Sequence, residues 1–150
     1  MEQNDPPQPA PDPVSAQGLT ALGCLYARLD QEIAQNAGKR CATCGDCCHF
    51  ESAGHRLYAS TLERSLLARQ ARPTHPDASQ SQLARGERCP FQVKQGCAAR
   101  QARTLGCRLF FCQDNAPEEW NVRAEAWHQE LKRLHDQLGV AWDYRPLLPL

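Results

Sequence analysis

The chain has 150 residues, and its 17 basic and 17 acidic side chains leave no formal net charge. This length allows one ordinary domain. The charge balance argues against a protein whose whole surface attracts nucleic acid. A mean hydropathy of −0.61 without a long apolar run excludes a membrane-spanning helix. Nine cysteines are more than an ordinary cytosolic domain carries and fewer than a dense secreted disulfide scaffold needs.

Residues 1–17 are predicted to form a disordered, proline-rich acidic tail. They contain five prolines and the acids Glu2, Asp5 and Asp12, with no basic residue. A secretory signal would begin with positive charge and continue into an apolar run, and neither is present. We therefore expect a cytoplasmic protein with reduced thiols, in which residues 18–150 form a single domain.

A helix is predicted over residues 18–37, because apolar side chains recur there at helical spacing and Gly38 supplies a stop. The apolar stripe consists of Leu19, Leu22, Leu25, Tyr26, Leu29 and Ile33. Cys24 lies away from this stripe. We expect it to be an incidental small residue rather than a metal ligand.

The middle of the chain is predicted to be largely irregular. Ser60 and Glu63 form a capping-box pattern at the start of a short helix that ends before Pro73. Residues 73–88 resemble a polar loop, and residues 91–97 form at most a small hairpin. Because this part of the chain shows little apolar periodicity, burial alone is not expected to hold it together.

The clearest element is a second amphipathic helix over about residues 117–138, which Gly139 ends. Its apolar stripe consists of Trp120, Ala124, Trp127, Leu131, Leu134 and Leu138. His128 and His135 lie beside this stripe, and we expect them at the edge of the core rather than on a metal. The chain after Gly139 is expected to lie across the body as an extended segment.

Eight of the nine cysteines fall within residues 41–112, and they are the candidate metal ligands. These eight are Cys41, Cys44, Cys47, Cys48, Cys89, Cys97, Cys107 and Cys112. In the CxxCxxCC motif that the first four form, two intervening residues let a tight turn direct both sulfurs at one ion. Three cysteines at this repeat can also supply three corners of an iron–sulfur cubane. Because neighbouring side chains diverge, Cys47 and Cys48 are expected to belong to two nearby metal sites. The spacing leaves open how the eight cysteines are divided between these sites.

The charge around these cysteines is positive: ten basic side chains and three acidic ones lie between His55 and Cys112. Positive charge favours the thiolate, which is the form that binds metal. The same excess is also typical of a solvated basic face that touches phosphate. His49 and His55 lie close enough to the motif to replace a thiolate.

The whole pattern resembles the CxxCxxCC cysteine-cluster family (YkgJ-like). The matching residues are the motif itself, Cys89-Pro90, Gly96-Cys97, the run Arg103-Thr-Leu-Gly-Cys107-Arg108 and Phe111-Cys112. Members are described as zinc- or iron-chelating and are sometimes labelled iron–sulfur oxidoreductases, so the resemblance implies that all eight cysteines are ligands. It covers roughly residues 41–112. Thr104 stands where the family usually has proline, which leaves the rigidity of that turn open.

Together these observations predict a small α+β protein, mostly helical and irregular, with a metal-stabilised cysteine-cluster core flanked by two amphipathic helices. We expect it to bind a 4Fe-4S iron–sulfur cluster or zinc in a structural or electron-transfer role, the latter with a protein redox partner. No membrane partner is expected.

Two alternatives remain: an iron–sulfur oxidoreductase or protein-modifying enzyme, and a zinc-finger-like module that binds nucleic acid or protein. The sequence contains no GxSxG, HExxH, Walker or dinucleotide-binding motif. We therefore predict no catalytic residue and favour a role other than catalysis. Overall neutrality argues against nucleic acid as the partner.

Overall fold

The computed structural model describes residues 14–36, 57–70, 89, 91–93, 96–109 and 118–147. Helices make up 71% of these residues, and two antiparallel sheets of two strands each accompany them. The described part is therefore a small, mostly helical α+β fold, as the sequence predicts. None of its helices combines the length and apolarity needed to cross a lipid bilayer.

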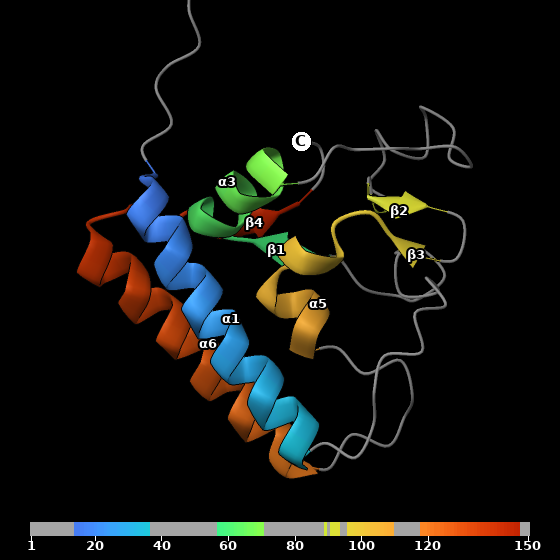
Figure 1. Ribbon diagram of the computed structural model, residues 1–150. Coiled ribbons are helices and arrows are strands. Elements are labelled where there is room, and N and C mark those ends of the chain that lie inside the picture. Colours follow the sequence, from blue (N-terminus) through green and yellow to red (C-terminus); the bar gives the residue numbers. More distant parts are fainter. Residues whose placement is uncertain are drawn as a thin grey trace, which may run out of the picture.

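The two long helices, α1 (Ala16–Asn36) and α6 (Glu118–Leu138), lie side by side and antiparallel (Figure 1). Near the end of α1, Glu32 accepts hydrogen bonds from Arg123 and Trp127 in the first half of α6. The predicted apolar stripes face inward. Their fully or almost fully buried members are Leu22, Leu25, Tyr26, Leu29, Trp120, Trp127 and Leu131.

The first helix begins two residues earlier than predicted, at Ala16. Val14 is buried, and its carbonyl accepts a hydrogen bond of 2.6 Å from Arg69. The Ser15 hydroxyl accepts a hydrogen bond of 3.1 Å from the Gly18 amide, which caps the helix. Residues 14–17 therefore belong to the folded body, which corrects the predicted boundary of the tail at residue 17. Residues 1–13 lie outside the described residues.

The last helix ends where the sequence predicts, at Gly139. This glycine has a φ of +67°, a left-handed conformation that glycine adopts without steric cost. Its amide donates to the Asp136 carbonyl at 3.3 Å, and the Val140 amide donates to the His135 carbonyl at 3.0 Å. This pair of hydrogen bonds is a Schellman motif, the common way to satisfy the last carbonyls of a helix.

The chain after α6 crosses the body as an extended segment, as predicted. Its strand β4 (Arg145–Pro146) pairs antiparallel with β1 (Tyr58–Ala59), which precedes α3. The buried Leu147 extends the pairing, because its amide donates to the Leu57 carbonyl at 2.8 Å. The C-terminal segment is thus fixed onto the middle of the chain.

The predicted capping box is present at the start of α3 (Thr61–Gln70). The Ser60 amide donates to Glu63 Oε2 at 2.8 Å, and the Glu63 amide donates to Ser60 Oγ at 3.4 Å. Both residues are fully buried. This short helix packs against α1 with its leucines inward.

The remaining elements are β2 (Gln92–Val93), β3 (Gly96–Cys97), the 3-10 helix η2 (Arg100–Ala102) and α5 (Leu105–Leu109). The pairing of β2 with β3 confirms the predicted hairpin. In Figure 1, α5 lies between β1 and α6, whereas the hairpin lies beyond it, away from the long helices.

The described core is a single apolar cluster to which the middle of the chain contributes directly. Its members from that region are Leu57, Ala59, Leu62, Leu66, Leu67, Cys89, Phe91, Ala99, Ala102, Leu105 and Leu109. The described parts of the middle segment thus contribute more apolar side chains to the core than the sequence predicts. Outside α3, these side chains come from elements of five residues or fewer, in which no periodicity can develop. A metal-stabilised core stays a prediction.

Candidate metal centre

The predicted ligand Cys107 lies on α5, a helix of five residues that would not be stable on its own. The first amide of this helix, from Leu105, donates to Glu63 Oε1 at 2.6 Å. Its last carbonyl, from Leu109, accepts a hydrogen bond of 3.2 Å from the indole of Trp120. The helix is thus tied to α3 at its start and to α6 at its end.

The Glu63 carboxylate is a fully buried junction of three segments. In addition to the Leu105 amide, Oε1 accepts a hydrogen bond of 3.0 Å from the Tyr26 hydroxyl on α1, while Oε2 accepts from the Ser60 amide. Sequence reasoning assigned this residue to the capping box alone. Its position among the apolar face of α3, three and four residues before Leu66 and Leu67, was the available signal that it is buried.

Burial raises the pKa of Tyr26 well above its usual value, and the adjacent Glu63 raises that pKa further by charge and by hydrogen bonding. The phenol therefore stays protonated and donates to the carboxylate throughout the physiological pH range. Because buried donors and acceptors cost free energy when they are left without partners, this hydrogen bond fixes α1 relative to α3.

Arg108, the residue after Cys107, holds α5 from another side. Its guanidinium donates to Asp30 Oδ2 at 2.6 Å and to the Gln101 carbonyl at 2.9 Å. It also lies 4.1 Å from the centre of the Tyr26 ring, an arrangement that favours cation–π attraction. Its side chain is 8% exposed. The guanidinium therefore acts as a planar clamp between α1, η2 and α5.

Several arginines of the positive segment have defined structural partners. Arg103 donates to the Cys107 carbonyl at 2.5 Å, and the Nε of Arg108 donates to the Arg103 carbonyl at 2.9 Å. Arg64 donates to the Asp143 carboxylate at 3.0 Å. The charge excess that the sequence associated with thiolates or phosphate is thus partly explained by capping and clamping within the fold.

Thr104 caps α5 and contacts the predicted ligand. Its hydroxyl oxygen accepts a hydrogen bond of 3.3 Å from the Cys107 amide and donates one of 3.3 Å to Cys107 Sγ. The threonine is 1% exposed. The turn that lacks the expected proline is therefore fixed by a side-chain cap.

The four described cysteines form no disulfide bond, and their surroundings differ. Cys89 is buried in the core, while Cys97 on β3 and Cys107 are half-buried and pack against it. Cys24 is exposed on α1, as predicted for a residue outside the ligand set.

The remaining predicted ligands lie outside the described residues. They are Cys41, Cys44, Cys47, Cys48 and Cys112, together with the alternatives His49 and His55. Within the described ranges, no three His, Cys, Asp or Glu side chains gather as a metal ion requires. Cys89, Cys97 and Cys107 thus do not make a site by themselves, and the predicted set stays a prediction.

Of the two histidines of α6 that the sequence places at the edge of the core, His128 is half-buried, whereas His135 lies inside the core. His135 is fully buried, its Nδ1 lies 3.3 Å from the Val140 carbonyl oxygen, and the Trp142 ring meets it edge-on at 4.9 Å. Its Nε2 has no hydrogen-bond partner among the described residues. Burial lowers the pKa of His135. His128 meets the ring of Tyr144 edge-on at 5.8 Å.

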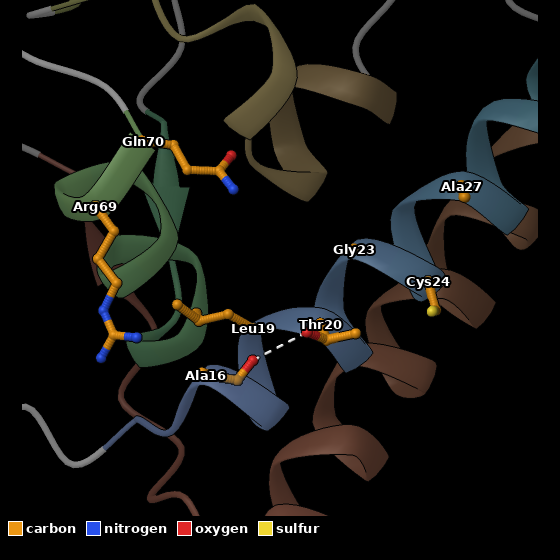
Figure 2. A pocket seen from close by; sticks show the side chains of 8 residues that line it. All are labelled: Ala16, Leu19, Thr20, Gly23, Cys24, Ala27, Arg69 and Gln70. Atoms are coloured by element: carbon orange, nitrogen blue, oxygen red, sulfur yellow. Dashed lines mark hydrogen bonds between the residues drawn. The ribbon is translucent and has the colours of Figure 1, made fainter.

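An open hollow of about 530 Å³ lies between the first half of α1 and the end of α3 (Figure 2). Its lining consists of Ala16, Leu19, Thr20, Gly23, Cys24, Ala27, Arg69 and Gln70. Cys24 is the one metal-ligating residue type in this lining, and the Thr20 hydroxyl is bonded to the Ala16 carbonyl at 3.0 Å. This lining therefore lacks the set of ligands that a metal ion requires.

Comparison of the chain with protein-family models, with curated proteins and with solved structures finds no match. The resemblance to the CxxCxxCC cysteine-cluster family thus stays a prediction from the residues.

Proposed function

We propose that this protein binds a thiophilic metal centre, either an iron–sulfur cluster or zinc, through the eight cysteines between residues 41 and 112. The centre has a structural or electron-transfer role. Bound zinc would cross-link loops of the chain without redox chemistry, whereas an iron–sulfur cluster would supply one-electron transfer.

The observation that carries this proposal is the built environment of Cys107. A five-residue helix presents this thiol, and buried partners from α1, α3 and α6 hold that helix. The thiol also receives a hydroxyl hydrogen bond, the kind of contact that orients a ligand sulfur around a metal.

The contrast with Cys24 supports the same conclusion. Cys24 is exposed on α1 and is the one cysteine outside the ligand pattern, whereas Cys89, Cys97 and Cys107 all pack against the core. These thiols fit zinc or an iron–sulfur centre, because thiolates are the preferred ligands of both. Neighbouring positive charge favours the thiolate form of a cysteine.

The test is to purify the protein without oxygen, record its visible spectrum, and measure iron, acid-labile sulfide and zinc per chain. Brown colour with sulfide is expected for an iron–sulfur centre, and stoichiometric zinc without colour is expected for the zinc form. Cys44→Ser should deplete the metal, whereas the matched Cys24→Ser variant should retain it. A protein without either metal, or equal metal content in both variants, contradicts the proposal.

A further inference from the structure

We propose that Thr104 is a positioning residue for the metal centre, because its hydroxyl directs the Cys107 sulfur; this inference rests on the proposed function. Thr104 contacts the predicted ligand Cys107 but is not a metal ligand itself. The two contacts between Thr104 and Cys107 carry the proposal.

The hydroxyl of Thr104 makes two hydrogen bonds with the same residue. It accepts from the Cys107 amide at 3.3 Å and donates to Cys107 Sγ at 3.3 Å. A hydroxyl has one hydrogen to donate and lone pairs to accept with, so both contacts can exist together. Because its oxygen already accepts from the amide, its hydrogen is available to the sulfur.

Burial shields the hydrogen bond between the Thr104 hydroxyl and the Cys107 sulfur from water. Thr104 is 1% exposed, so water has little access to compete for the hydroxyl. The backbone on both sides is fixed, since the Leu105 amide donates to Glu63 and the Cys107 carbonyl accepts from Arg103. With the backbone held, the remaining freedom of Cys107 is rotation of its side chain, which the hydroxyl–sulfur hydrogen bond restricts.

Partners of this kind orient metal ligands, and removing them lowers metal affinity by about 10- to 100-fold. Capping a helix and restraining a sulfur are separable functions, because an acceptor alone suffices for the cap. Asp at position 104 would keep the acceptor and lose the donor. Val would lose both, and Ser would keep both.

The experiment measures cobalt(II) affinity by chelator competition, and the thiolate-to-cobalt absorption band, on the reduced full-length chain. The variants are T104V, T104D and T104S, with S60A as the control. Ser60 is a fully buried cap on α3, so S60A should lower the thermal midpoint as T104V does without touching Cys107. We expect T104V and T104D to bind cobalt about 10- to 100-fold more weakly and to shift the band. The cobalt affinities of T104S and S60A should stay within about twofold of the wild-type value, far from the 10- to 100-fold loss expected for the other two variants.

Two results overturn the inference, and they are distinguishable. If the wild type binds cobalt and T104D binds it equally well, Thr104 is a helix cap and nothing more, while the proposed function stands. Equal loss of affinity in T104V and S60A leads to the same conclusion. If the wild type binds no cobalt, the proposed function fails and the positioning role fails with it.

Discussion

The hydroxyl of Tyr26 on α1 donates a buried hydrogen bond of 3.0 Å to the carboxylate of Glu63 on α3. The same carboxylate oxygen accepts from the first amide of α5, so a single side chain joins three helices. The position of Cys107 therefore depends on a polar contact at the centre of the core.

Replacing Glu63 with Gln should destabilise the fold strongly. The amide group of Gln turns one acceptor into a donor, which leaves at least one of the Tyr26, Ser60 and Leu105 donors buried without an acceptor. We expect a loss of about 3 kcal/mol in the free energy of unfolding, measured in urea. The control E130Q, on the surface of α6, should change it by less than about 0.5 kcal/mol. Equal effects of the two substitutions would contradict the junction role.

Arg108→Lys should loosen α5 although it preserves the charge. Lysine cannot bridge Asp30 and the Gln101 carbonyl with one planar group, nor lie flat over the Tyr26 ring. A loss of about 1–2 kcal/mol is expected from the two contacts, together with faster amide exchange in α5. Arg133→Lys is the matched control, because Arg133 is 63% exposed. Unchanged exchange in the Arg108 variant would show that the clamp is dispensable.

Leu131→Ala should create a cavity between α6 and the core. Leu131 is fully buried, so its truncation should cost about 3 kcal/mol in thermal or urea unfolding. Val122→Ala on the same helix provides the comparison, because Val122 is 75% exposed. If both variants lose the same stability, the described orientation of α6 is wrong.

The stability of the fold should depend on pH through His135. Burial lowers the pKa of its imidazole in the folded state, so the unfolded state binds a proton more readily. The free energy of unfolding should therefore fall as the pH drops through the ordinary histidine value of about 6.5, and level off below the folded pKa.

The contribution of His135 is the difference between the wild type and H135F in the pH dependence of the free energy of unfolding, because the two proteins share every other titrating group. H135F should lose less stability between pH 7 and pH 5, and Phe retains an aromatic edge for Trp142. Parallel curves for H135F and the wild type would count against a buried neutral imidazole.

The sequence predicted those features that depend on neighbouring residues. The apolar stripes of α1 and α6, the Ser60–Glu63 capping box and the stop at Gly139 all follow from helical periodicity and local backbone chemistry. The extended C-terminal segment was likewise predicted from its own residues, which include Trp142, Tyr144 and prolines.

The rest depends on contacts between distant residues. Glu63 meets Tyr26 and Leu105 across separations of 37 and 42 residues, and Arg108 meets Asp30 across 78. No local pattern encodes such pairs. The start of α1 was also missed, because Val14 follows Pro13 in a polar, proline-rich stretch and its burial depends on packing.

Within the candidate site, the spacing of the cysteines predicted ligands but not their support. Thr104 attracted notice as a departure from the expected proline, and its role as a cap and a sulfur contact became visible in three dimensions. The exposure of Cys24 was predictable, since the residue lies off the apolar stripe.

The most direct test of a thiolate-held metal centre is differential alkylation of the native protein, purified without oxygen, with each cysteine followed by peptide mass spectrometry. If a metal centre holds the thiolates, Cys24 reacts at once, while the eight cysteines of residues 41–112 react only after a strong chelator is added. If all nine cysteines react at the same rates with and without the chelator, no metal centre protects them, and the proposed function is wrong.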